Sequence, residues 1–107
     1  PITEEEKVAR AILFTGPELV LHVVDGKHLE RSLALTLQLM DTGLPLILVV
    51  NMLDEAERAG IKVDLARLQE RLGIPVVGTA AATGRGLEEL NASVSRSWHR
   101  TGEREAV

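Results

Sequence analysis

An apolar run at residues 44–50 ends abruptly at two polar side chains, Asn51 and Asp54. Apart from Pro45 the run is entirely aliphatic, which is typical of a strand covered on both faces in a parallel sheet. Parallel sheets bind ligands outside the carboxyl ends of their strands, so Asn51 and Asp54 lie where a ligand is expected. Asparagine and aspartate are also common helix caps and turn formers, and this pattern alone leaves both interpretations open.

Strands and helices are predicted to alternate along the chain. Residues 18–25 and 74–79 are further short apolar runs beside glycine or proline, so both are predicted strands. Helices are predicted for residues 1–15, 27–42, 52–59 and 65–72, and for a last segment after Gly86. This order predicts an α/β fold of three layers, in which a parallel sheet of three strands lies between flanking helices.

The first and last helices are predicted from local patterns. Thr3 and Glu6 form a capping box, and apolar residues at helical spacing follow it as far as Leu13. In the last helix, Leu90, Val94 and Trp98 share one face, so we expect Trp98 to be partly buried against the sheet.

Composition excludes several classes of function. A net charge of -4 with interspersed acids and bases argues against a nucleic-acid surface. The absence of cysteine excludes disulfides and thiolate metal sites, and the histidines lack metal-ligand spacing, so no metal site is predicted. No apolar run approaches the length needed to span a bilayer.

A second loop, Thr79-Ala80-Ala81, follows the third predicted strand. Its small residues allow the backbone to approach a ligand closely. A carboxylate such as Asp54 can accept two hydrogen bonds from the ring N–H and the amino group of guanine, a pair of donors that adenine lacks. The two loops together therefore point more specifically to guanine recognition than either loop alone.

These loops resemble the base-specificity motifs of small GTPases, and residues 83–90, Thr-Gly-Arg-Gly-Leu-Glu-Glu-Leu, resemble the segment that follows the second motif in many bacterial GTPases. The chain resembles more closely the GTP-binding domain of the ferrous iron transport protein B family, FeoB. That resemblance rests on Val-Val-Asp-Gly at 23–26, Leu-Glu-Arg-Ser-Leu at 29–33, Leu-Thr-Leu-Gln-Leu at 35–39, Asn-Met-Leu-Asp-Glu-Ala at 51–56, and the run from Gly60-Ile61 to Val77. Met52 stands where most small GTPases have lysine, a departure that this family shares.

The resemblance implies that residues 1–107 are the C-terminal part of a P-loop (Ras-like) GTPase domain, from the second switch helix to the last helix. Asp54 would accept from guanine N1 and N2, and Asn51 would contact the base and tie the loops together. The Ala80 and Ala81 amides would approach the guanine oxygen. The implied base-binding residues are Asn51, Met52, Asp54, Thr79, Ala80 and Ala81. The intact protein would bind GTP or GDP with Mg²⁺, hydrolyse GTP, and regulate ferrous iron uptake through an attached membrane region at the cytoplasmic face of the bacterial inner membrane.

The chain contains no Gly-x-x-x-x-Gly-Lys-Ser/Thr sequence and no Asp-x-x-Gly, so it lacks the residues that hold the phosphates and Mg²⁺. No catalytic residue is therefore assigned, and these residues alone are predicted not to hydrolyse GTP. In the family's sheet the strand within residues 18–25 pairs with the phosphate-loop strand, so one of its edges would be open here. We expect self-association through this edge or pairing with a complementary fragment. Two alternatives remain: another bacterial GTPase, and a nucleotide-free α/β module that binds a partner protein.

Overall fold

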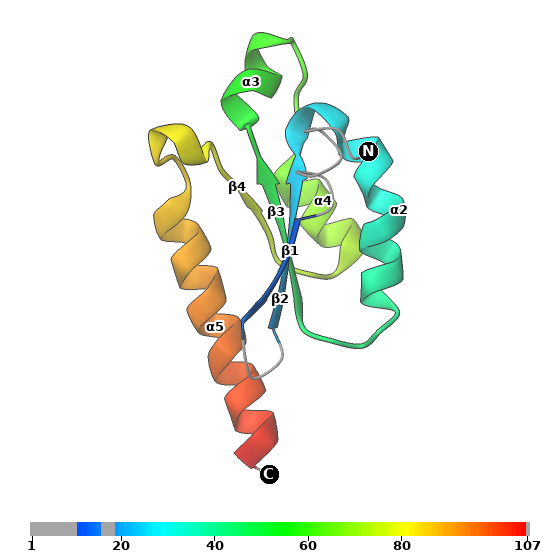
Figure 1. Ribbon diagram of the computed structural model, residues 1–107, viewed down its shortest axis with the longest axis vertical. Coiled ribbons are helices and arrows are strands. Elements are labelled where there is room, and N and C mark those ends of the chain that lie inside the picture. The colour runs from blue at the N-terminus through cyan, green and yellow to red at the C-terminus, as the bar shows by residue number, and fades with distance from the viewer. Residues whose placement is uncertain (1–10, 16–18, 107) are drawn as a thin grey trace.

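The computed structural model describes residues 11–15 and 19–106, with the side chains of residues 19–98. The strands are β1 (Ala11–Thr15), β2 (Leu19–Asp25), β3 (Leu46–Asn51) and β4 (Val76–Gly78). The helices are α2 (Leu29–Met40), α3 (Leu53–Arg58), α4 (Leu65–Leu72) and α5 (Leu87–Ala106), and the short 3-10 helices are η1 (Gly26–His28) and η2 (Ala81–Thr83). These elements form three layers, with α5 on one face of the sheet and α2 and α4 on the other (Figure 1).

The sheet has the strand order β1-β2-β3-β4, and its last three strands are parallel. β2 pairs with β3 from Val20 opposite Leu46 to Asp25 opposite Asn51. The carboxyl ends of β2, β3 and β4 therefore lie at the same end of the sheet, where η1, α3 and η2 follow them (Figure 1). The predicted α/β fold, with three parallel strands and flanking helices, is confirmed.

Side chains of the parallel strands alternate between two hydrophobic clusters. The cluster beneath α5 contains Leu19, Leu21, Ile47, Val49 and Val77. The cluster beneath α2 and α4 contains Val24, Leu48, Val50, Leu53 and Val76. β3 is buried along its aliphatic part, as predicted for a strand covered on both faces. Burial of each such side chain stabilises the fold by about 1.5–3 kcal/mol relative to exposure, which makes β3 the centre of the core.

Local signals set the bounds of two helices. The Asp64 carboxylate accepts a hydrogen bond from the Arg67 N–H at 3.0 Å and so caps the start of α4. Gly73 ends that helix in the left-handed region with φ of 74°. α2 lies within predicted residues 27–42 and packs Leu29 and Leu33 against the core.

Polar groups buried beneath α2 are hydrogen-bonded to one another. His22 is fully buried on β2, and its Nδ1 lies 3.1 Å from the Thr36 hydroxyl. That hydroxyl also donates to the Ser32 carbonyl at 3.1 Å. The network joins β2 to α2. His22 is therefore assigned a structural role as a buried, hydrogen-bonded side chain, and no catalytic or ligand-binding role.

The helix predicted over residues 1–15 is wrong in its last part, because Ala11–Thr15 form strand β1. β1 pairs antiparallel with β2, from Ala11 opposite Val23 to Thr15 opposite Leu19. Its sequence, Ala-Ile-Leu-Phe-Thr, includes residues that favour strands, and the free side of β2 offers backbone partners for all of it. The predicted capping box at Thr3 and Glu6 lies outside the described residues.

The open sheet edge predicted for residues 18–25 is also wrong, because β1 occupies that side of β2. A strand with its backbone groups already paired is no longer a template for another chain. The reason for expecting self-association through this edge is therefore removed.

The single tryptophan is partly buried, as predicted, but it is more exposed than Leu90 and Val94 on the same helix. Trp98 on α5 keeps 43% of its surface exposed, whereas Leu90 and Val94 pack against the cluster beneath α5. Leu90 and Val94 therefore supply aliphatic contacts between α5 and the sheet.

Candidate functional site

Three polar side chains follow the parallel strands at the carboxyl end of the sheet. Asp25 ends β2, Asn51 ends β3 directly opposite it, and Thr79 follows β4. The Thr79 N–H donates to the Val50 carbonyl at 2.8 Å, so pairing with β3 continues past the end of β4. The structure therefore brings together the loops after β3 and β4, as predicted from the parallel strands.

The Asn51 side chain ties these two loops together. Its Oδ1 accepts hydrogen bonds from the Thr79 hydroxyl at 2.9 Å and from the Ala81 N–H at 3.1 Å. The Leu53 N–H in turn donates to the Thr79 carbonyl at 3.1 Å. The two donors fix the orientation of the Asn51 amide, whose nitrogen makes no hydrogen bond within the described residues. The predicted tie is confirmed, and it leaves the amide nitrogen available to a ligand.

Met52 turns the chain sharply between Asn51 and Asp54. Its φ of 59° and ψ of 34° lie in the left-handed region, which no other non-glycine residue of the described chain adopts. This conformation costs a residue with a side chain about 1–2 kcal/mol. The turn returns Leu53 to the core, where its side chain packs so closely on Gly78 that a Cβ there would overlap it. Strain at Met52 is therefore balanced by the burial of the next residue.

Asp54 lies in the first turn of α3 with 26% of its side chain exposed. Met52 is the N-cap of this helix, and no side chain caps it, so the capping interpretation of Asn51 and Asp54 is wrong. The nearest cation is the Arg58 guanidinium, with Nη2 at 3.7 Å from Oδ2. The Asp54 carboxylate accepts no hydrogen bond within the described residues, so its oxygens remain available as acceptors.

The backbone amides predicted to face a guanine oxygen already have partners. The Ala80 N–H donates to the Arg85 carbonyl at 3.0 Å, in an isolated bridge across the loop. The Ala81 N–H donates to Asn51, so a ligand would have to share it. The structure thus disagrees with a ligand role for the Ala80 amide. The exposed Ala82 has an N–H with no acceptor in the described chain, and the sequence did not single it out.

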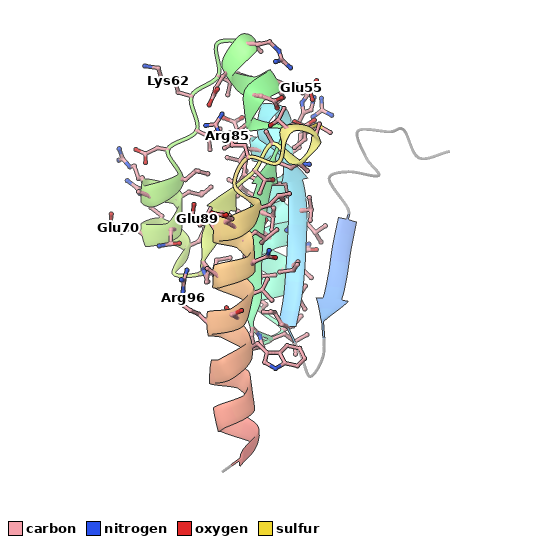
Figure 2. All side chains as sticks on the ribbon, turned by 90° about the vertical axis from the view of Figure 1, so that its left-hand side faces the viewer. Glu55, Lys62, Glu70, Arg85, Glu89 and Arg96 are labelled. Carbon is pink, nitrogen blue, oxygen red and sulfur yellow. The ribbon has the colours of Figure 1, made fainter. Side chains whose placement is uncertain are left out.

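A pair of opposite charges links α3 to the loop after β4. The Arg85 Nη1 donates to the Glu57 Oε2 at 3.1 Å, and Nη2 lies 2.9 Å from Oε1, so the contact is bidentate. The hydrogen bond from Arg85 lowers the pKa of Glu57 below its ordinary value, and the same bond raises the pKa of Arg85. Arg85 lies beside this end of the sheet in Figure 2. Glu57 and Arg85 are 28 residues apart, and no sequence pattern predicts an ion pair between them.

Gly86 allows the loop after β4 to fold back on itself. Its φ is 81°, and a Cβ at this position would collide with the Gly78 carbonyl. Gly84 has the same φ of 81° but open space around it. Close approach of the backbone at Gly86 therefore fixes the distance between β4 and the start of α5.

A charged group on η1 also reaches α3. The Asp25 carboxylate accepts from the Lys27 N–H at 2.8 Å, which caps η1. The Lys27 ammonium lies 3.9 Å from Asp25 and 3.5 Å from Glu55 on α3. The loop after β2 is thus joined electrostatically to the loop after β3.

The described residues hold neither a metal-binding cluster nor a membrane-spanning helix. They contain no group of three or more histidine, aspartate or glutamate side chains that could hold a metal ion. Among them no helix is both long and apolar enough to cross a membrane.

These elements define a domain with the P-loop GTPase fold. The structure is similar to the FeoB G-domain from Methanococcus jannaschii, at 44% identity and a TM-score of 0.73, over 76% of this chain and 51% of that one. It is also similar to the cytosolic domain of the T. maritima FeoB iron transporter in its GMPPNP form, at 41% identity and a TM-score of 0.72, over 75% of this chain and 32% of that one.

The family described as ferrous iron transport protein B matches residues 1–94, and the chain belongs to this family. Similar curated proteins include the Fe(2+) transporter FeoB of Salmonella typhimurium, which is 42% identical over 93 residues, and that of Escherichia coli, which is 41% identical over 93 residues. In both cases the match covers 87% of this chain and 12% of the relative.

Proposed function

We propose that this chain is the guanine-recognition part of a GTP-binding domain. The observation that carries the proposal is the tie at Asn51. Its Oδ1 is held by the Thr79 hydroxyl and the Ala81 N–H, so its nitrogen is left to donate to a base. Across the turn at Met52, the Asp54 carboxylate has acceptor capacity for the N1 and N2 donors of guanine.

The remaining roles follow from the same geometry. The Met52 side chain would cover the base with an apolar, polarizable surface, as a lysine stem does in other small GTPases. Thr79 would position Asn51 rather than touch the ligand. Ala81 and Ala82 would offer backbone N–H groups to the guanine oxygen, and Ala80 would hold the loop through its bond to Arg85.

The phosphates and Mg²⁺ would be held by residues outside these 107. The chain has no phosphate-loop sequence, and the match to the M. jannaschii G-domain spans only 51% of that structure. We therefore assign residues 1–107 to the C-terminal part of the domain, assign no catalytic residue to it, and expect no GTP hydrolysis from it alone. Discrimination between bases is the chemistry that this part contributes.

The function of the whole protein is proposed from its relatives. Related structures include an S. thermophilus domain bound to GDP and AlF4- and the GMPPNP form from T. maritima. The curated relatives are Fe(2+) transporters. We propose that the intact protein binds and hydrolyses GTP at the cytoplasmic face of a bacterial inner membrane, and that it thereby regulates ferrous iron uptake through an attached membrane region. Membership of this family favours that function over another bacterial GTPase or a nucleotide-free interaction module.

Binding of fluorescent nucleotides to the complete domain tests this proposal. The chain is expressed together with the phosphate-loop segment, and titrations with labelled GDP and labelled ADP are compared. We expect a preference for GDP of at least about 100-fold, because adenine leaves the Asp54 carboxylate without donors. Equal affinity for the two nucleotides would show that the loops after β3 and β4 do not read guanine.

A further inference from the structure

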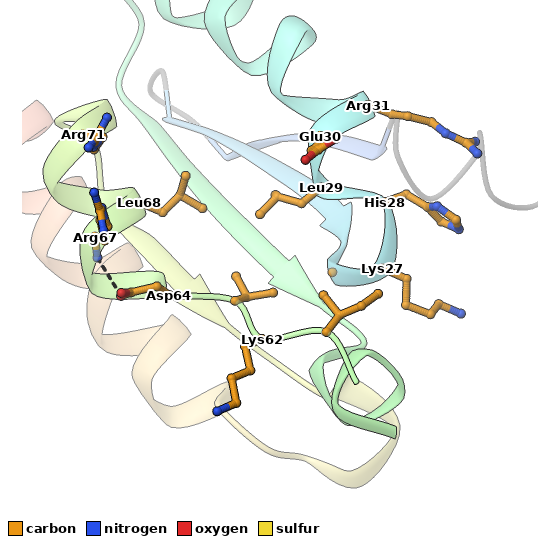
Figure 3. A pocket seen from close by; sticks show the side chains of 13 residues that line it. Lys27, His28, Leu29, Glu30, Arg31, Lys62, Asp64, Arg67, Leu68 and Arg71 are labelled. Carbon is orange, nitrogen blue, oxygen red and sulfur yellow. Dashed lines mark hydrogen bonds between the residues drawn. The ribbon is translucent and has the colours of Figure 1, made fainter. Parts of the chain in front are cut away.

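A groove lies between α2 and the segment that leads into α4, away from the loops proposed to bind guanine. Its walls are η1 and the start of α2 on one side and residues 61–71 on the other, and it encloses about 630 Å³. Figure 3 shows Leu29 and Leu68 pointing into it from opposite walls. None of the residues proposed to contact guanine lines this groove.

The floor of the groove is apolar. Leu29, Val63 and Leu68 line it, and all three are half-buried side chains that pack against the hydrophobic cluster beneath α2 and α4. Ile61 adds a side chain that is 38% exposed. A concave apolar surface that packs directly on the hydrophobic core can bind a partner that inserts aliphatic side chains.

The rim of the groove is basic, although the whole chain is acidic. Five lysine or arginine side chains line it and only two carboxylates, Glu30 and Asp64, which gives +3 against a net charge of -4 for the chain. The five are Lys27, Arg31, Lys62, Arg67 and Arg71. The Asp64 carboxylate already accepts the hydrogen bond that caps α4, so Glu30 is the acid at the rim that has no such capping role.

Three of these cations make no internal ion pair. Lys62, Arg67 and Arg71 are exposed, and the ion pairs of the described chain do not include them. Figure 3 shows Arg67 and Arg71 along one wall and Lys62 on the segment that precedes α4. These unpaired charges are available to a ligand at the edge of an apolar floor.

We propose that this groove binds an acidic amphipathic helix of a partner protein. Aliphatic side chains at helical spacing would lie on Leu29, Val63 and Leu68, and carboxylates on both flanks would pair with the basic rim. A small anion would neutralise the rim but leave the apolar floor in water. A flat anionic membrane would meet the rim without filling a concave floor.

A designed peptide tests this assignment. The probe is a fluorescein-labelled helical peptide of about 14 residues, with leucine at positions i, i+3, i+4 and i+7 and glutamate elsewhere. Fluorescence polarisation with the full chain should give saturable binding with a dissociation constant below about 100 μM, weakened by salt. The same peptide with glutamine in place of glutamate should bind at least about tenfold more weakly.

Matched variants locate the binding surface. Arg71→Glu on the rim should weaken binding of the acidic peptide by about tenfold, whereas Arg96→Glu, the same charge change on exposed α5, should alter it less than about twofold. Ile61→Ser tests the apolar side and should weaken binding by at least about threefold. Circular dichroism checks that each variant keeps the fold.

Three results would overturn the proposal. One is the absence of saturable binding up to about 1 mM peptide. Another is equal weakening by Arg71→Glu and Arg96→Glu, which would mean attraction to overall charge. The third is binding to vesicles of phosphatidylcholine and phosphatidylserine that is lost in Arg71→Glu and unaffected by Ile61→Ser, which would assign the rim to an anionic membrane.

Discussion

Replacing Asn51 with alanine removes the acceptor that joins the loops after β3 and β4. Thr79 is 1% exposed, so its hydroxyl would lose its partner in a place that water does not reach freely. An unsatisfied buried hydroxyl costs about 1–3 kcal/mol, and the exposed Ala81 N–H, which water can pair, adds about 0.5 kcal/mol. We therefore expect Asn51→Ala to lower the free energy of unfolding by about 1.5–3.5 kcal/mol.

A double-mutant cycle separates this contact from other effects of the substitution. Thr79→Val removes the same hydrogen bond from the other side and leaves no orphaned hydroxyl. The cost of Asn51→Ala in the Thr79→Val background should therefore fall by about 1–2 kcal/mol. Urea unfolding followed by circular dichroism measures each variant, and Asn91→Ala on exposed α5 is the control, expected within about 0.5 kcal/mol of the parent. Additive costs, or a cost below about 0.5 kcal/mol for Asn51→Ala, would refute the tie.

Further predictions concern the turn and the loop around this site. Met52→Val should destabilise the chain by about 1–2 kcal/mol in thermal unfolding, because a β-branched residue is disfavoured at positive φ, whereas Met52→Asn should be better tolerated. Gly86→Ala should cost more than Gly84→Ala, because both share the positive φ and only the first meets a backbone carbonyl; equal melting temperatures would contradict this. The lowered pKa of Glu57 means that its pair with Arg85 is fully formed above the ordinary glutamate pKa of 4.5 and is lost as pH falls through the lower value of the folded state. An NMR titration of the Glu57 carboxyl should show this, and a midpoint at the ordinary value would count against the pair.

The centre of the fold could be predicted because its signals are local. The uninterrupted aliphatic run before Asn51 requires burial on both faces, and glycines at positions such as 43 and 73 follow the last turns of helices. Parallel pairing then places the carboxyl ends of neighbouring strands together, so the meeting of the two loops followed from topology. The tie through Asn51 was implied by the family resemblance, and the structure makes it through the Thr79 hydroxyl.

The errors concern features that depend on distant parts of the chain. Ala11–Thr15 fit a helical spacing as well as a strand, and the choice depends on the free side of β2, which the segment itself does not encode. The bond from Ala80 to Arg85 and the left-handed turn at Met52 arise from the path of the folded loops. The pairing of Arg85 with Glu57 likewise requires two loops to meet first.

The most direct test of guanine recognition replaces the carboxylate of Asp54 with an amide. Asp54→Asn replaces an acceptor with an N–H donor, which opposes the amino group of guanine but pairs with the oxygen that xanthine carries in its place. In the complete domain, affinity for GDP should fall by at least about 100-fold while affinity for xanthosine diphosphate rises. Asp64→Asn, the same change at the cap of α4, should alter neither. An Asp54→Asn domain that still prefers GDP and gains nothing for the xanthine nucleotide would contradict the central claim.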